Sequence, residues 1–328
     1  MRKIINNYPS ESALIIVLTI IGVILSFTTD TFFTLANFSS LLNNNAVSMI
    51  WAFGLLVVLI AGGIDVSFAV AASVVQYLCV KLFGIIPSNW FIGIACASAI
   101  GAALGLINAF LIQRFHITSI VITIATFNAF FGLLMFFSGG KFLYDLPDWL
   151  INRINFAEYQ SSTGSWAELT LPTVTMFIIM LFTWLLLRYT NIGRQLYAFG
   201  NNPEGARRLG ISPWRCQAIA FGWLGVMAGI GGLMQAHLVQ EVVPNALIGR
   251  ELDVLAAVVL GGARLGGGRG TVLGCFLGVL LVAVTQNSLN LLGVSPYAFK
   301  MVIGAVILLA ISLPGLRLLK TSRRPETA

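Results

Sequence analysis

Charged side chains are scarce in this sequence. Asp, Glu, Lys and Arg together make up 9% of its 328 residues, against about a quarter in a typical soluble domain. Apolar residues make up 58%, and the mean hydropathy is +0.91. This composition excludes a soluble domain, because too few polar side chains are present to cover a surface in water. It predicts an all-α polytopic membrane protein that forms a single unit over residues 1–328.

Histidine and cysteine are also rare, with two and four residues. His116 and His237 are far apart in the sequence and give no metal-ligand spacing, so we expect no metal site and no cofactor. The cysteines lie in or beside apolar runs without a CxxC spacing, which is typical of small packing residues. They are Cys79, Cys96, Cys216 and Cys275.

Catalytic motifs for chemistry inside a membrane are missing from the apolar runs. There is no pair of aspartates, no HExxH helix and no Ser and His pair at depth, which argues against an intramembrane hydrolase. The glycine-rich stretch LGGARLGGGRGT at 260–271 lacks the lysine that a phosphate-binding P-loop requires. The sequence therefore predicts a protein that is not an enzyme.

Ten apolar runs are long enough, or nearly long enough, to cross a bilayer. The eighth falls short of the roughly twenty residues that a spanning helix needs, which suggests a broken or re-entrant helix. The ten runs are residues 13–30, 44–62, 66–84, 90–112, 117–138, 171–188, 216–238, 252–263, 271–292 and 297–316.

Basic residues favour one orientation of these runs. With both termini in the cytoplasm, fourteen of the nineteen Lys and Arg residues lie inside, as the positive-inside rule requires. The loop at about 189–216 is then cytoplasmic and the loop at about 139–170 periplasmic. The net charge of +7 follows from this topology and does not indicate a nucleic-acid partner. The five residues that face outward are Lys81, Lys141, Arg153, Arg250 and Lys300.

The cytoplasmic loop carries the start and stop signals of a two-turn helix. It has, in this order, an N-cap residue, a proline at the first helical position, an acid in the first turn, bases in the last turn and a glycine for a left-handed cap. A loop that only reconnects two membrane helices needs no such helix, so we interpret it as a docking helix for a cytoplasmic protein. The alternative is a solvated surface helix. The residues concerned are Asn202, Pro203, Glu204, Arg207, Arg208 and Gly210.

A second motif, AGGIDVS at 61–67, interrupts a helix with Gly62 and Gly63. Asp65 then brings a carboxylate to the membrane edge, where it needs hydrogen-bond partners or a helix N-terminus. We interpret Asp65, followed by Ser67, as the N-cap of the third helix. A direct role in transport is the alternative.

Glycine pairs four residues apart predict close contacts between helices. The stretches VVLIAGGIDVS at 57–67 and AVVLGGARLGG at 257–267 also echo one another, which hints at duplicated halves of a transporter. The glycine pairs are Gly101 with Gly105, Gly225 with Gly229, and Gly274 with Gly278.

Together these segments resemble the ribose-permease-like family, the inner-membrane permease subunits of bacterial ABC importers for monosaccharides. The resemblance runs from about residue 40 to residue 315 and rests on four motifs. They are AGGIDVS at 61–67, ITSIVITIATFNAFFGLLMFFSGG at 117–140, AFGNNPEGARRLGIS at 198–212 and AAVVLGGARLGGGRGTVLGCFLGVLL at 256–281.

The resemblance implies a type II importer fold of about ten helices that pairs with a second permease copy or a paralogue. It further implies cytoplasmic ATPase subunits bound at about 200–212 and a periplasmic sugar-binding protein on the outer face. In such a protein the docking helix couples transport to ATP hydrolysis. The expected coupling residues are Asn202, Pro203, Glu204, Arg207, Arg208 and Leu209, with the charges pairing to the ATPase and Leu209 filling a groove.

A route for a neutral sugar needs weak hydrogen-bonding groups rather than a tight site. Polar residues within the spans are candidates, and for each the alternative is a hydrogen bond between helices. A rival hypothesis is an ion-coupled secondary transporter of a small polar solute, which needs ionisable groups at mid-membrane that the spans nearly lack. The candidates are Asn45, Gln76, Asn128, Gln235 and Asn287, with Asn128 and Gln235 the foremost.

The orientation can be tested with single cysteines in a cysteine-free background. We expect Gly205→Cys to react with an impermeant thiol reagent only from the cytoplasmic side, and Ser161→Cys only from outside, because of the distribution of basic residues. Labelling of Gly205→Cys from the periplasm would contradict this topology.

Overall fold

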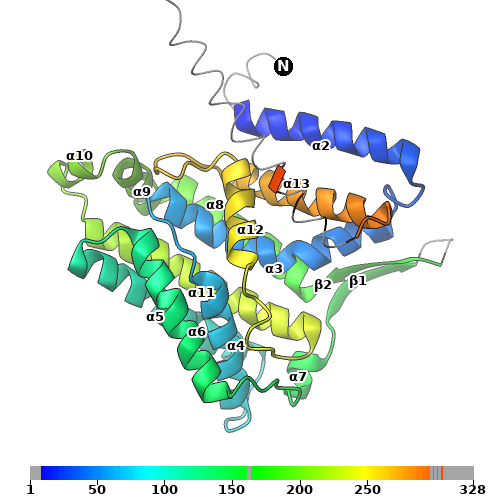
Figure 1. Cartoon of the computed structure of the whole chain (residues 1–328), viewed down its shortest axis with the longest axis horizontal. Coiled ribbons are helices and arrows are strands. Elements are labelled where there is room, and N and C mark those ends of the chain that lie inside the picture. Colours follow the sequence, from blue (N-terminus) through cyan, green and yellow to red (C-terminus); the bar gives the residue numbers. More distant parts are fainter. Residues whose placement is uncertain (1–8, 161–163, 296–297, 299–300, 302–303, 306–328) are drawn as a thin grey trace, which may run out of the picture.

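The computed structural model describes residues 9–160, 164–295, 298, 301 and 304–305. Its described part is helical apart from one short hairpin (Figure 1). In chain order the elements are α2 (Pro9–Thr28), α3 (Leu35–Ile60), α4 (Phe68–Phe83), α5 (Trp90–Phe115), α6 (Ser119–Ser138), α7 (Asp148–Ile151), β1 (Asn155–Gln160), β2 (Trp166–Thr170), α8 (Leu171–Tyr189), α9 (Asn191–Asn201), α10 (Pro203–Arg208), α11 (Pro213–Val239), α12 (Arg250–Leu260) and α13 (Val272–Leu291).

Seven of the described helices are long and apolar enough to span a bilayer: α2, α3, α5, α6, α8, α11 and α13. Helix α4 has 16 residues and α12 has 11. At 1.5 Å per residue α12 is about 16 Å long, roughly half of the hydrocarbon core. The eighth run is thus as short as predicted. The tenth run, 297–316, falls almost wholly outside the described residues, as do the basic residues at 2–3 and 317–324.

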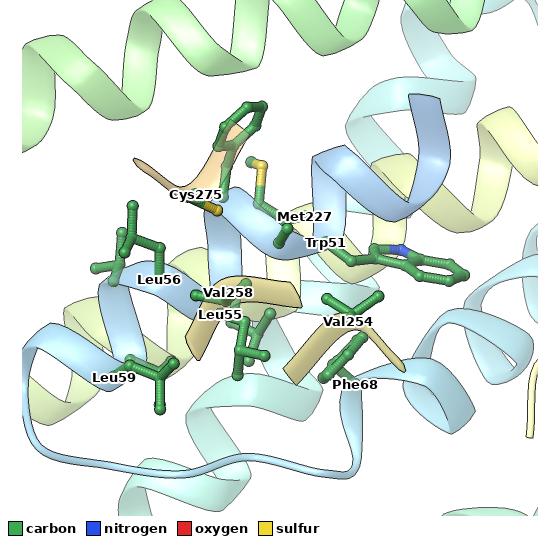
Figure 2. Close-up of a cluster of buried hydrophobic side chains, with 14 of the residues drawn as sticks. Trp51, Leu55, Leu56, Leu59, Phe68, Met227, Val254, Val258 and Cys275 are labelled. Carbon is green, nitrogen blue, oxygen red and sulfur yellow. The ribbon is translucent and has the colours of Figure 1, made fainter. Parts of the chain in front are cut away.

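Helix α3 is the central element of the bundle. Every residue from Met49 to Ile60 is buried, as expected of a helix that is apolar on all sides. Helices α8, α9, α11, α12 and α13 pack around it. Figure 2 shows how side chains from five helices meet there: Trp51, Leu55, Leu56, Leu59, Phe68, Met227, Val254, Val258 and Cys275.

Helices α5 and α11 lie against each other through glycines. A Cβ atom on Gly101 would overlap the carbonyl oxygen of Gly225, and one on Gly105 would overlap that of Phe221. Gly274 and Gly278 of α13 face the backbone of Gly261 and Ala257 in the same way. The close packing predicted from the glycine spacing is therefore present, because only a residue without a Cβ allows backbones to approach this closely.

The two echoing stretches end their helices with the same hydrogen bonds. After α3, Gly62 N–H donates to Leu59 O and Gly63 N–H to Val58 O; after α12, Gly262 N–H donates to Val259 O and Ala263 N–H to Val258 O. Both are Schellman caps. The left-handed position is a glycine each time, Gly62 at φ 82° and Gly262 at φ 91°.

The segment predicted as a plain loop at 139–170 is partly ordered. It contains α7 and an antiparallel hairpin, β1–β2. The hairpin is tied to α3, since the Glu168 carbonyl accepts hydrogen bonds from Ser39 Oγ at 2.7 Å and Asn43 Nδ2 at 3.0 Å. Thr170 Oγ1 donates to Asn43 Oδ1 at 2.9 Å. These bonds fix where the hairpin sits on the bundle.

The glycine contact between α5 and α11 can be tested by adding one methyl group. We expect Gly105→Ala to destabilise the protein by about 1–3 kcal/mol, the usual cost of overpacking. The matched control is Gly132→Ala in α6, whose added Cβ meets no atom within 4 Å. Thermal unfolding of the detergent-solubilised variants gives the measurement. Equal unfolding midpoints for the two variants would refute the account.

Candidate functional site

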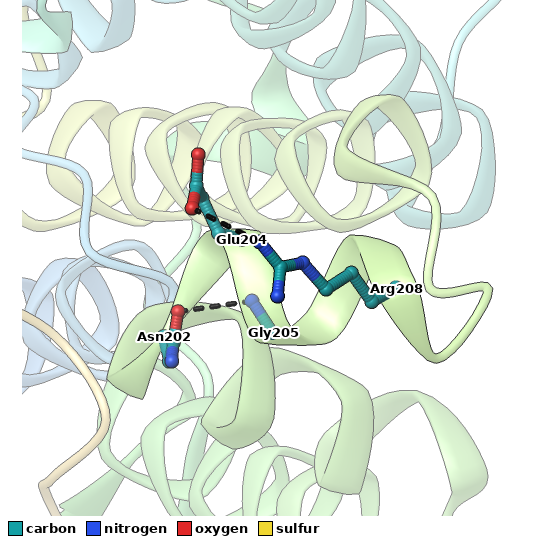
Figure 3. Close-up of polar contacts among 4 residues, drawn as sticks. All are labelled: Asn202, Glu204, Gly205 and Arg208. Atoms are coloured by element: carbon teal, nitrogen blue, oxygen red, sulfur yellow. Dashed lines mark hydrogen bonds and ion pairs between the residues drawn. The ribbon is translucent and has the colours of Figure 1, made fainter.

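The short helix predicted within the loop at 189–216 is present as α10 (Figure 3). Asn202 is its N-cap, and its Oδ1 accepts a hydrogen bond from Gly205 N–H at 2.9 Å. Pro203 occupies the first helical position, and Gly210 has φ 81° just beyond the end. Only six residues are helical, so the predicted two turns were an overestimate: Leu209 already serves as the C-cap.

The outer side of α10 is charged and exposed. Glu204 and Arg208 form an ion pair at 4.0 Å with side chains 87% and 84% exposed, which makes the pair energetically weak. Arg207 is also exposed, and Leu209 is 82% exposed. Ala206 faces inward and is buried. The helix thus presents both signs of charge and one apolar side chain at an extremity of the molecule (Figure 1).

A cluster of four glycines, which we call the glycine corner, connects α10 to the core. It consists of Gly62, Gly200, Gly267 and Gly268. Gly200, at the end of α9, lies so close to the last carbonyl of α3 that a Cβ would overlap Ile60 O. Gly268 N–H donates to the same oxygen at 2.9 Å. Tyr197 Oη adds a hydrogen bond to Gly270 O at 2.8 Å. Helix α9, the end of α3 and the loop after α12 are therefore joined at one point.

Asp65 lies in the segment between α3 and α4 and is buried, 2% exposed. Its Oδ1 accepts hydrogen bonds from Ser67 N–H at 2.6 Å and Ser67 Oγ at 2.7 Å, and its Oδ2 accepts one from Asn108 Nδ2 at 3.2 Å. Burial raises the pKa of this carboxyl, and the hydrogen bonds from Ser67 and Asn108 oppose that rise.

Contrary to the prediction, Asp65 is not the N-cap of α4. That position belongs to Ser67, because the helix begins at Phe68. The carboxylate instead stabilises the turn that precedes the helix and links it to Asn108 of α5. Its contacts within the described part of the chain are the hydrogen bonds that hold this turn.

Two polar cavities lie along α3 and α12. The larger, about 470 Å³, borders the hairpin, and we call it the hairpin cavity; its lining includes Asn43, Glu168, Gln235 and Arg250. The smaller, about 250 Å³, lies between α3, α12 and α13, and we call it the helix cavity; its lining includes Asn45, Asp253 and Gln286. Asn44 and Arg250 line both. The cavities therefore adjoin each other at these two side chains.

The candidate path residues are scattered by the fold. Asn45 lines the helix cavity and Gln235 the hairpin cavity. Gln76 is buried and donates to Gly232 O at 2.7 Å, and Asn287 donates to Asn37 Oδ1 at 2.9 Å, so both join helices. Asn128 is exposed and bonds to Ile124 O of its own helix. Asn128 is therefore not at either cavity.

Sequence reasoning missed Arg250 and Asp253 as cavity residues. Both lie on α12, one turn apart, at the end of the helix that faces the hairpin. Arg250 had been assigned only as an outward-facing base. Its proximity to Gln235, at 3.2 Å between Nη1 and Oε1, arises from the turn between α11 and α12 and has no signal in local spacing.

Residues 37–311 match the protein family described as branched-chain amino acid transport system / permease component. The chain belongs to this family of membrane permeases. Its relatives are transporter subunits and not enzymes. Seven helices among the described residues are long and apolar enough to cross a bilayer, and the chain is a multi-pass protein of the bacterial inner membrane.

Curated relatives extend over nearly the whole chain. The ribose import permease protein of Escherichia coli is 30% identical over 91% of both chains. The galactose/methyl galactoside import permease protein of the same species is 29% identical over 96% of this chain and 97% of its own. The autoinducer 2 import system permease protein of Photorhabdus luminescens is 30% identical over 96% and 92%. No solved structure matches the chain.

We expect the glycine corner to hold α10 in place. We expect Gly200→Ala to push α9 away from Ile60 O and to speed tryptic cleavage at Arg207 and Arg208, because cleavage requires local opening of α10. Gly266→Ala is the matched control, since its Cβ comes no nearer than 3.7 Å to another atom. Cleavage rates would be compared on the purified protein. Equal rates in both variants would show that the corner does not hold α10.

Proposed function

We propose that this permease is the membrane-spanning subunit of an ATP-driven ABC importer and that its cargo is a monosaccharide or a similar small sugar. The observation that carries the proposal is α10, an exposed, capped helix anchored by the glycine corner to the ends of α3 and α12. Such a helix is suited to receive force from a cytoplasmic partner. The permease itself supplies a path and has no reaction to catalyse.

Two observations support a sugar as cargo. Relatives that cover more than nine-tenths of the chain are named for ribose and for galactose. The two cavities are lined by amides and by both signs of charge, groups that bond to hydroxyls as donor or acceptor. The family description names branched-chain amino acids, so uptake should be competed with ribose, galactose and leucine. Competition by leucine alone would favour the amino acid.

The orientation follows from the distribution of basic residues. In it the α9–α10 segment faces the cytoplasm and binds ATPase subunits through Glu204, Arg207, Arg208 and Leu209. The hairpin side faces the periplasm and receives a sugar-binding protein. A second permease copy or paralogue completes the path. An ion-coupled secondary transporter is not favoured, because the relatives are import permeases.

Glu204→Lys tests the docking role of α10. The variant places a base at the helix N-terminus, where an acid is favoured, and reverses the charge offered to the partner. We expect normal insertion and yield, poor co-purification of the ATPase subunits, and loss of solute-stimulated ATP hydrolysis.

The matched control is Glu158→Lys, which makes the same charge change on the exposed strand β1 and should leave ATPase binding intact. Full ATPase association and normal uptake in Glu204→Lys would mean that α10 is only a solvated surface helix.

A further inference from the structure

The hairpin cavity and the helix cavity meet at Arg250. This residue is the first of α12, and it lines both cavities together with Asn44. Arg250 and Asn44 are the residues that the linings of the two cavities share. Arg250 therefore stands at the boundary between two adjoining polar spaces.

The backbone holds Arg250 at this boundary. Gly249 has φ 90°, and its N–H is bonded by both carboxylate oxygens of Glu251 at 3.1 and 2.9 Å. Helix α12 then continues to its Schellman cap at Gly262 and packs on α3 and α13. The short helix that begins at Arg250 is thus held at both of its ends.

The guanidinium of Arg250 makes fewer hydrogen bonds to described residues than it has donors, and Asp253 on the same helix attracts it electrostatically. An arginine carries five N–H donors in a planar fork. Within the described part of the chain, Arg250 makes one side-chain hydrogen bond, from Nη1 to Gln235 Oε1 at 3.2 Å. That bond links the Arg250 side chain to α11. Its length and its neutral acceptor make it an exchangeable contact, since charge-assisted pairs are shorter and about twice as strong.

We propose that Arg250 closes the passage between the two cavities, and that it opens when oxygen atoms of the solute replace Gln235 Oε1 as the acceptor. The inference rests on the proposed import function. Asp253, one turn further along α12, lines the helix cavity beyond Arg250. A hydroxyl can accept from Arg250 and then donate to Asp253, whereas an anion can only accept. The passage therefore suits an uncharged polyhydroxylated solute.

Thiol labelling in the complete importer tests the barrier without knowledge of the cargo. In a cysteine-free background, Ser40→Cys reports on the hairpin cavity and Gln286→Cys on the helix cavity. The probe is the anionic sulfonatoethyl methanethiosulfonate, added from outside. We expect Arg250→Ala to raise the labelling rate of Gln286→Cys by about tenfold, which corresponds to a barrier lowered by about 1.4 kcal/mol. Labelling of Ser40→Cys should not change.

The direction of the rate change shows whether Arg250 acts as a barrier or only through its charge. Loss of a positive charge would slow an anionic reagent, so a faster reaction means a wider passage. Arg153→Ala is the matched control, because it removes another guanidinium from the hairpin cavity that does not line the helix cavity. It should leave Gln286→Cys unchanged. An unchanged or slower rate in Arg250→Ala would overturn the proposal.

Two substitutions of Gln235 keep the proposal testable if Arg250→Ala fails to fold. Gln235→Glu gives Arg250 a charged acceptor, which should strengthen the contact and slow labelling of Gln286→Cys by an uncharged methanethiosulfonate reagent, on which the added charge exerts no repulsion. Gln235→Leu removes the acceptor and should speed it. Equal rates in these two variants would refute the closure. Failure of the import function shows separately, as absence of ATP-dependent D-ribose or D-galactose uptake by the wild-type complex.

Discussion

The carbonyl oxygen of Ile60 is the point on which the rest of this structure depends. It ends the central helix α3, accepts the Gly268 N–H at 2.9 Å, and lies against Gly200 with no room for a Cβ. One backbone atom thus joins the buried core, the loop after α12 and the segment that carries α10. A side chain at either glycine would separate these elements, so the absence of side chains there lets α9, which leads into α10, lie directly against the end of α3.

The few polar groups within the bundle are used sparingly and for distinct purposes. Asp65 is satisfied by Ser67 and Asn108 and stabilises a turn. Gln76 joins α4 to α11. Arg250, in contrast, makes a single hydrogen bond with the described residues, to a neutral partner, and borders two cavities. A membrane protein usually satisfies its buried polar groups internally, so a group with donors left over beside a cavity can hydrogen-bond to a solute there.

Features with local causes were predictable from the sequence. Asn202, Pro203 and Gly210 placed the docking helix because capping acts over a few residues, and glycines four apart placed the close helix contacts. The hairpin was missed because its position depends on Asn43 and Ser39, more than a hundred residues away in the chain. Which candidate path residues line a cavity was not predictable, since a polar residue in a span serves a cavity or a neighbouring carbonyl equally well. Gln235 reaches the hairpin cavity, while Asn128 bonds to its own helix.

Helix α12 connects the glycine corner to the two cavities. One end leads through its Schellman cap to the glycine corner beneath α10, and the other carries Arg250. A rigid rod of about 16 Å pivoting at the corner by about 4° displaces its far end by about 1 Å. That is enough to lengthen a hydrogen bond of 3.2 Å beyond its useful range. Because α12 has only 11 residues, a small tilt at the glycine corner and the breaking of a hydrogen bond at Arg250 lie within one short rigid element.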